Sequence, residues 1–174
     1  MKQCGSKKSA SCVFAAGVAT LAILAAACSG GGSSTPDVTA KVGEKVSTEK
    51  YEIAVTTVFT IGTFGSEYAP QKPADGALFV VVKHSMKNIS KEPQSVLLTS
   101  VKLIDPQGVS YDSASGPTMM YKIDAGIDSK ALSKLNPGLS EKDATLFEVS
   151  RELWNKPGWK VIVDADKNVS FTLK

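Results

Sequence analysis

Histidine and carboxylate side chains are the groups of this chain whose types could support acid–base or metal chemistry. His84 is the only histidine among 174 residues. It could be a metal ligand, a general acid or base, or a hydrogen-bonded histidine on the buried face of a strand. No second histidine or free cysteine completes a usual transition-metal site. No Gly-x-Ser-x-Gly motif supplies a nucleophile for a triad built on His84. We therefore interpret His84 as structural and expect no catalytic residue.

An acidic stretch near the C-terminus has part of the spacing of a calcium loop. Asp164, Asp166 and Asn168 match its first three ligand positions. Val169 follows where a glycine is usual, and the chain as given ends before a bidentate glutamate at the twelfth position. The same residue types also suit a hairpin turn. We interpret this stretch as a turn, with a weak alternative as a metal site, and expect no cofactor.

The beginning of the chain resembles a bacterial lipoprotein export signal. A basic start precedes an uncharged apolar run over residues 13–27, which suits a signal h-region and is short for a membrane span of about 20 residues. Small residues then precede Cys28, as in a lipobox, although Ala25 stands where leucine is usual. We predict a signal peptide over 1–27, an acylated Cys28 and a Gly/Ser linker over 28–37. An ordinary Ala-x-Ala cleavage before a chance cysteine is the alternative.

Charge and cysteine content narrow the function classes. The chain has 20 basic and 17 acidic side chains, and removing the three lysines of the signal leaves 17 of each. A neutral mature protein has no basic excess that would indicate nucleic acid as a partner. Cys4 and Cys12 would leave with the signal, so the mature domain has no pair for a disulfide. We expect a domain held by packing alone and anchored by lipid to the extracytoplasmic face of the cell membrane.

The segment at residues 77–89 is the element around which the fold is expected to form. After an apolar start it alternates, which places Leu78, Val80, Val82, His84 and Met86 on one face of a strand. Lysine and serine side chains occupy the other face. Further strands are predicted at residues 41–46, 51–61, 94–98, 101–105, 109–111, 142–150, 159–164 and 169–173.

Short strands with turns about every ten residues predict an all-β architecture. We expect an antiparallel, immunoglobulin-like sandwich of 7–9 strands over residues 38–174. In the strand at 51–61, Ile53, Val55, Thr57 and Phe59 are expected to share one face. Trp159 is expected in the core. The main core positions are predicted to be Leu78, Val80, Val82, Phe147, Val161 and Phe171.

The longest interruption of the strand pattern, residues 113–137, is the expected working surface. A short helix capped by Asp128 is predicted inside it, over residues 129–135. Long ordered connections are uncommon unless they are functional, although covering one end of the sandwich is the alternative. Outside the strand pattern the connection holds a dense apolar set, and Trp154 could either pack or be exposed for binding. The candidate partner surface comprises Met119, Met120, Tyr121 and Trp154.

Several segments together resemble a known family. They read KVGEKVSTEKYEIAV, ALFVVVKHSMKNISKEPQSV, VKLIDPQGVSYD and LNPGLSEKDATLFEVSREL, and a terminal hairpin follows them. The chain resembles the telokin-like, immunoglobulin-like domain of small Gram-positive lipoproteins, a domain of unknown function. A secreted mycobacterial immunogenic protein is similar in fold class. The resemblance covers residues 41–174 and implies an immunoglobulin-like sandwich at the cell envelope. It implies no catalytic residues.

Three function classes follow from these observations. The first is a non-enzymatic interaction module that meets an envelope or extracellular protein. The second is a lipoprotein that binds a small ligand or metal and delivers a solute. The third, an envelope hydrolase, lacks a nucleophile–base pair. A pocket of convergent polar groups near His84 would favour the second class, and a shallow apolar patch would favour the first.

Overall fold

The strands form two main sheets and one small pair. The computed structural model describes residues 36–96, 99–127 and 134–173, so Cys28 and the predicted signal peptide and linker up to residue 35 lie outside the described residues. The described elements are β1 (Val38–Lys41), β2 (Lys45–Ser47), β3 (Tyr51–Ile61), β4 (Ala77–Asn88), β5 (Gln94–Ser95), β6 (Ser100–Ile104), β7 (Ser110–Tyr111), α1 (Ser115–Asp124), β8 (Lys134–Leu135), β9 (Ser140–Ser150), α2 (Arg151–Trp154), β10 (Lys160–Asp164) and β11 (Asn168–Thr172).

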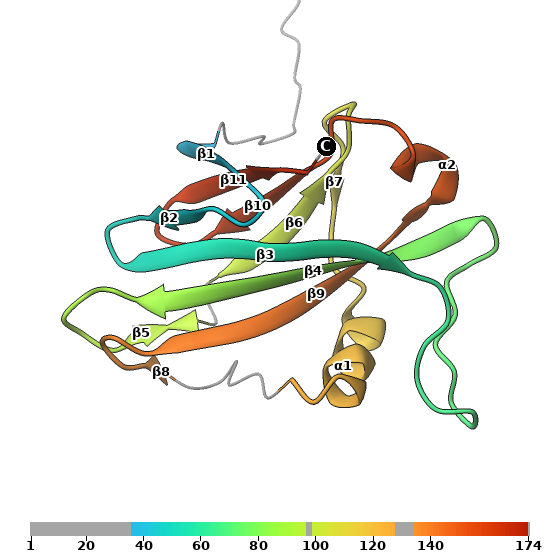
Figure 1. The fold of residues 1–174 in the computed structure, drawn as a ribbon, viewed down its shortest axis with the longest axis horizontal. Helices are drawn as coiled ribbons and strands as arrows, with labels where there is room; N and C mark the ends of the chain where they lie inside the picture. Colours follow the sequence, from blue (N-terminus) through green and yellow to red (C-terminus); the bar gives the residue numbers. More distant parts are fainter. Residues whose placement is uncertain (1–35, 97–98, 128–133, 174) are drawn as a thin grey trace, which may run out of the picture. The chain divides into compact units, whose positions relative to one another are not determined.

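One sheet has the order β1-β11-β10-β6-β7, the second has the order β2-β3-β4-β9, and β5 pairs with β8. The pairs are antiparallel except β1 with β11, which is parallel. The two larger sheets are separate layers (Figure 1). The predicted all-β sandwich is confirmed. Its described strands outnumber the expected 7–9 because four of them contain only two or three residues.

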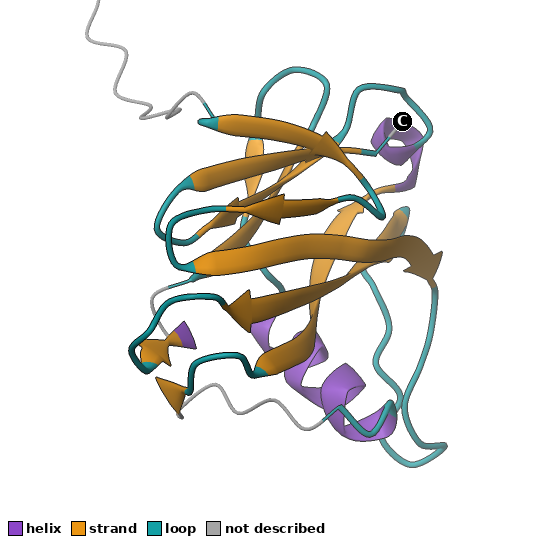
Figure 2. Ribbon diagram, turned by 60° about the vertical axis from the view of Figure 1, so that its left-hand side comes forward, coloured by secondary structure: helices purple, strands orange, loops and turns teal. Residues whose placement is uncertain are grey.

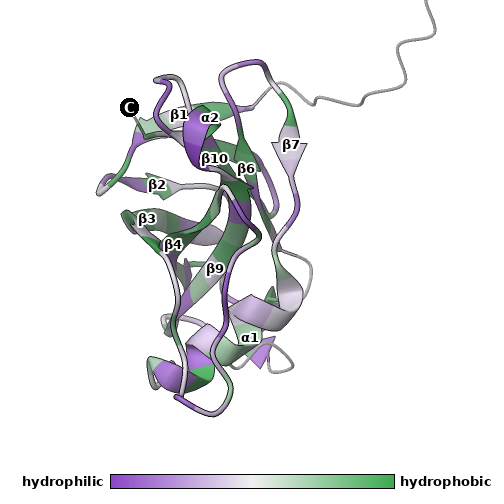
Figure 3. Cartoon of the chain, turned by 90° about the vertical axis from the view of Figure 1, so that its right-hand side faces the viewer, coloured by the Kyte–Doolittle hydropathy of each residue, from purple (hydrophilic) through white to green (hydrophobic). Residues whose placement is uncertain are grey.

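The main core lies between the two larger sheets and follows from the alternation of β4. Leu78, Val80 and Val82 are buried on the inner face of β4, and Trp159 is buried in the same cluster, as predicted. Hydrophobic residues concentrate in the strands (Figure 3). All six predicted core positions are confirmed as buried: Leu78, Val80, Val82, Phe147, Val161 and Phe171.

A second apolar cluster covers the outer face of the four-stranded sheet. Phe79 and Val81 of β4 and Leu146 of β9 pack there against Tyr121 of α1. Figure 2 shows α1 beside this sheet. Burial on both faces explains why β4 begins with a continuous apolar run instead of a strict alternation.

A β-bulge in β3 places the side chains of its second half on the face opposite to the predicted one. The register pairs Val55 with His84 and then Thr57 with Lys83, so Thr56 is an extra residue. An extra residue turns every later side chain to the opposite face. The shared face predicted for Thr57 and Phe59 with Ile53 and Val55 is therefore wrong. Thr57 is exposed, and Phe59 packs in the outer cluster.

Two short segments also differ from expectation. The strand predicted over residues 41–46 is divided between β1 and β2, because a turn with Gly43 at φ 92° separates them and they join different sheets. The strand predicted over 94–98 is reduced to β5, and residues 97–98 lie outside the described residues.

The helix of the long connection lies earlier than predicted. Residues 128–133 lie outside the described residues, and Lys134 and Leu135 form β8, so these two residues are strand and not helix. The helix α1 instead spans Ser115–Asp124, with Gly116 and Pro117 in its first turn. A proline is tolerated in the first turn of a helix because its missing N–H would have no partner there. Within the described residues, no helix is long and apolar enough to cross a membrane.

Candidate functional site

The inner face of β4 and β9 changes from apolar to polar along its length. The register places Val80 opposite Phe147, Val82 opposite Thr145 and His84 opposite Asp143. Because side chains alternate along a strand, these paired residues share the face that looks toward the other sheet. The apolar half is sealed in the core. The polar half lines a cavity.

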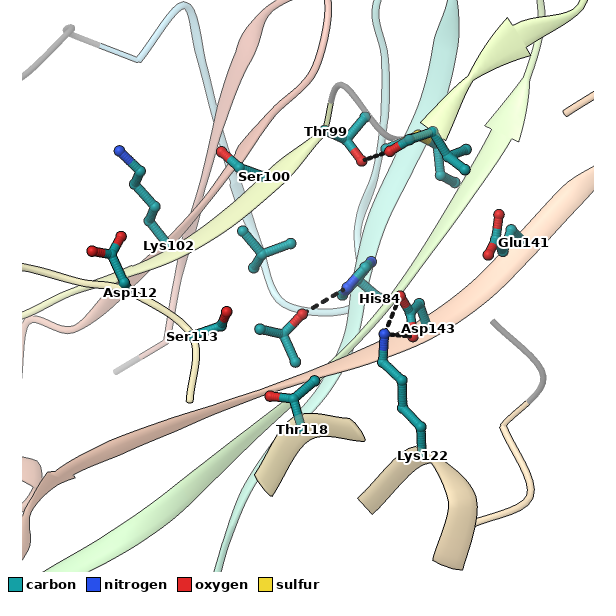
Figure 4. A pocket seen from close by; sticks show the side chains of 14 residues that line it. His84, Thr99, Ser100, Lys102, Asp112, Ser113, Thr118, Lys122, Glu141 and Asp143 are labelled. Atoms are coloured by element: carbon teal, nitrogen blue, oxygen red, sulfur yellow. Dashed lines mark hydrogen bonds and ion pairs between the residues drawn. The ribbon is translucent and has the colours of Figure 1, made fainter. Parts of the chain in front are cut away.

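The cavity has a volume of about 370 Å³ and lies between the polar half of β4 and β9 and the strand β6. The connection from β7 into α1, α1 itself and residues that precede β6 supply its remaining walls (Figure 4). Its lining is mostly hydroxyl-bearing and charged, with an apolar part from Met86, Val96 and Val101. The polar lining residues are His84, Thr99, Ser100, Lys102, Asp112, Ser113, Thr118, Lys122, Glu141, Asp143 and Thr145.

His84 lies half-buried in this cavity. Its Nε2 atom is 3.3 Å from the hydroxyl oxygen of Thr145. Burial lowers the pKa of His84 from 6.5 to about 4; the Asp143 carboxylate opposes this change and the Lys122 ammonium adds to it. The imidazole is therefore neutral at pH 7.

The second ring nitrogen of His84 is open to the cavity. No described residue bonds to Nδ1. Every fully buried side-chain nitrogen or oxygen in the described part of the chain has a hydrogen-bond partner. Nδ1 is therefore accessible from the cavity and free to donate to, or accept from, a bound molecule according to the tautomer.

Lys122 and Asp143 form an ion pair at the wall of the cavity. The ammonium lies 2.7 Å from Oδ1 and 2.8 Å from Oδ2, and both side chains are one-fifth exposed. The backbone N–H of Ala144 also donates to Oδ1. The charge and lone pairs of Asp143 are thus largely satisfied within the protein.

The N-terminal half of α1 closes the edge of β9 beside the cavity. The backbone N–H of Leu146 donates to the hydroxyl of Thr118 at 3.0 Å, and the N–H of Ala114 donates to the carbonyl of Leu146 at 2.8 Å. These bonds occupy an outward-facing part of an edge strand that would otherwise be open to pairing. They also position Lys122, one turn further along α1, over Asp143.

Thr145 and His84 do not complete a catalytic triad within the described residues. Thr145 and His84 resemble a nucleophile and base, but Nδ1 of His84 lacks the carboxylate that orients the base of a catalytic triad. Asp143, the nearest candidate for that role, is held by Lys122. A histidine with a pKa of about 4 is also a weak general base at neutral pH.

The residues of the predicted calcium stretch have structural contacts. Asp166 accepts hydrogen bonds from the hydroxyl of Thr48 at 2.6 Å and the backbone N–H of Lys50 at 2.8 Å, which joins the β10–β11 turn to the turn before β3. Asp164 and Asn168 are opposite each other at the end of the hairpin. Among the described residues no group of three or more His, Cys, Asp or Glu side chains could hold a metal ion.

The predicted partner surface is only partly exposed. Met119 and Met120 are 63% and 47% exposed on α1. Tyr121, which belongs to α1, is 9% exposed because its ring packs against that of Phe64, with ring centroids 5.7 Å apart. Trp154 is 6% exposed because its ring lies 5.1 Å from that of Trp159. The packing alternative for Trp154 is therefore confirmed, and the prediction that Tyr121 belongs to an exposed partner surface is wrong.

This burial yields a test that separates the two sides of α1. Tyr121→Ser is expected to lower the free energy of unfolding by about 3 kcal/mol, since it removes a large side chain from the outer cluster. Met119→Ser, the matched exposed change, should alter it by less than about 0.5 kcal/mol. Urea unfolding measures both, and equal values would contradict the assignment of the two faces.

One side of the cavity could have been predicted from the sequence of β9. In the segment KDATLFEVS, Asp143 and Thr145 precede Phe147 and Val149 at a spacing of two, so a polar pair continues the buried face of β9. The opposite wall, formed by Ser100, Lys102 and Ser113, follows only from the packing of the sheets.

Comparison with known proteins places the chain in a family. The family model described as "Domain of unknown function (DUF4352)" matches residues 40–153. The uncharacterized protein YxkC of Bacillus subtilis is 38% identical over 125 residues, which cover 71% of this chain and 69% of that protein.

Solved structures agree with the fold. A conserved hypothetical protein from Bacillus anthracis is similar with a TM-score of 0.66 and 28% identity, covering 75% of this chain and 93% of that one. An uncharacterized β-sandwich protein from Clostridium difficile 630 is similar with a TM-score of 0.55 and 17% identity, covering 79% and 95%. The chain belongs to the DUF4352 family of β-sandwich domains of unknown function.

Proposed function

We propose that this domain binds a small polar molecule in the cavity at His84, as the extracytoplasmic part of a protein anchored by lipid at Cys28. The observation that supports binding is a cavity of about 370 Å³ with convergent polar groups, including the accessible Nδ1 of His84. Ligand sites are commonly concave, with an apolar part and a few placed polar groups. The role is non-enzymatic.

A protein-interaction module is the second candidate. The observation that favours it is the apolar exposure of α1, where Met119, Met120 and Ile123 are 63%, 47% and 66% exposed. Contiguous exposed apolar groups can mark a contact surface. We favour ligand binding over protein interaction because the cavity is concave and is lined by polar groups that have no partner within the described residues.

The test is ligand-observed NMR with a panel of polar compounds, namely neutral sugars, amino acids, dipeptides, organic acids and phosphates. Ser100→Trp places an indole at the mouth of the cavity. Ser110→Trp makes the same change at an exposed serine on the neighbouring strand β7, outside the cavity. At least one class should bind the wild type and Ser110→Trp and lose binding at least tenfold in Ser100→Trp.

Two results would contradict the proposed ligand site. If no class binds the wild type at 10 mM, or if Ser100→Trp binds as well as Ser110→Trp, the cavity is not a ligand site.

A further inference from the structure

We infer that the ligand is an uncharged, polyhydroxylated molecule of one or two saccharide rings; this inference rests on the proposed cavity function. The first argument is charge. Asp143 is neutralised by Lys122, and Lys102 and Asp112 bring opposite charges to the cavity mouth. Glu141, the remaining charged lining residue, takes part in an interaction within the protein. A ligand with a net charge would lose hydration on entry and gain no uncompensated partner.

The second argument is the kind of hydrogen-bonding groups that remain available. The side-chain hydroxyls of Ser100 and Ser113 have no hydrogen bond to another described residue, and neither does Nδ1 of His84. A hydroxyl both donates and accepts, and a neutral imidazole nitrogen does one or the other. Sugar hydroxyls have this dual character, so they can match a mixed set of donors and acceptors that a purely donating or purely accepting ligand would leave unsatisfied.

The third argument is the apolar part of the lining and the size of the space. Met86, Val96 and Val101 offer a patch for the C–H face of a sugar ring. A volume of about 370 Å³ lies at the small end of the roughly 300–1,000 Å³ typical of small-molecule sites. A wholly apolar ligand would fit the patch but leave His84 and the hydroxyls without partners, which is costly in a confined site.

Other ligand classes fit less well. A metal ion lacks a cluster of three carboxylate, histidine or cysteine ligands in the described residues. A free amino acid could use Lys102 and Asp112, but both are exposed, and exposed charge pairs contribute little affinity.

The experiment compares sugars that differ in charge alone. Glucose, maltose and N-acetylglucosamine are titrated against glucosamine and glucose 6-phosphate by NMR at pH 7. At least one neutral sugar should bind ten times more tightly than both charged sugars, and Ser100→Trp should abolish its binding. His84→Leu should weaken binding about tenfold, whereas His84→Gln, which keeps hydrogen-bonding groups, should stay within about threefold.

A charge variant tests the mechanism of selection. Lys122→Met leaves the Asp143 carboxylate uncompensated, so affinity for glucosamine should rise relative to glucose. Thermal melting shows that each variant is folded before it is compared. Should Lys122→Met not fold, the comparison of neutral and charged sugars on the wild type decides the inference.

The possible failures are distinguishable. Cavity-dependent binding of amino acids, organic acids or phosphates without neutral sugars overturns the saccharide inference and supports the proposed function. Absence of cavity-dependent binding by any class overturns both.

Discussion

Val82→Asp is expected to abolish the cooperative unfolding transition of the domain. Val82 is completely buried at the centre of the inner face of β4, opposite Val58 on one side and Thr145 on the other. An aspartate there would either keep a charge without a partner or bind a proton at a large cost. An effective penalty of several kcal/mol for a buried ion is comparable with the total stability of about 5–15 kcal/mol of a typical domain.

Thr57→Asp is the matched control on the adjacent strand. Thr57 is exposed directly after the bulge and is paired with Lys83, so an added carboxylate faces water and a cation. Its melting temperature should stay within a few degrees of the wild type. Circular dichroism melting measures both variants. Native-like cooperative melting of Val82→Asp would show that the strand is not the centre of the core.

The second large effect is a loss of stability on acidification through His84. Its folded pKa is about 4, and the ordinary value of 6.5 applies to the unfolded chain. Between these values the unfolded state binds a proton that the native state does not, so the stability contributed by this group falls as the pH is lowered from 6.5 to 4. The difference of about 2.5 pH units corresponds to at most about 3 kcal/mol, and water in the cavity reduces it.

Several charged groups face the cavity and must be considered with His84. Lys122 from α1 opposes protonation, and Asp143 from β9 favours it. Glu141, Lys102 and Asp112 complete the charged lining. Carboxylates elsewhere also titrate below pH 5, so the contribution of His84 has to be isolated by a variant that lacks only the imidazole.

His84→Gln supplies that comparison, since it removes the titration and keeps a polar side chain. Urea unfolding at pH 7.0, 5.5 and 4.5 should show the wild type losing more stability than His84→Gln, by about 1–3 kcal/mol at the lowest pH. As His84 is the only histidine, its ring resonances in NMR report the folded pKa directly. A folded pKa near 6.5 with parallel stability curves would refute the prediction.

The residues of both predictions, Val82 and His84, lie on the same strand, β4. The same strand that contributes Val82 to the core continues through His84 into the cavity wall. A rigid, doubly covered strand therefore holds the candidate ligand contact, and binding sites on rigid elements keep their geometry better than sites on loops.

Much of the fold could be derived from the sequence because local alternation is strong. The period of two over β4 placed Leu78, Val80 and Val82 in the core. The strands predicted at residues 101–105 and 109–111 correspond to β6 and β7, and Gly108 has a φ of 88° in the turn between them. The terminal hairpin was predictable for the same reason, since Val161 and Phe171 are opposite each other in register. Such patterns depend on residues close together in the chain.

The bulge at Thr56 and the position of α1 could not be derived in that way. A bulge adds one residue without a change in composition, and here it turns Phe59 from the predicted inner face to the outer cluster. The helix contains Gly116 and Pro117 and becomes stable by packing Tyr121 onto the outer face of the sheet. Tertiary contacts in this case override local preference.

The sequence by itself determined the all-β class, the central strand and the residues that fill its core, since a buried face must repeat every second residue. It also showed that His84 continues that face. Only the tertiary structure decided which residues share the cavity with His84, because Asp143, Lys122 and Ser100 come from three separate elements brought together by sheet pairing and by the crossing from β7 to α1. A cavity is a property of how two sheets separate at their edges, and no local pattern in the chain encodes that separation.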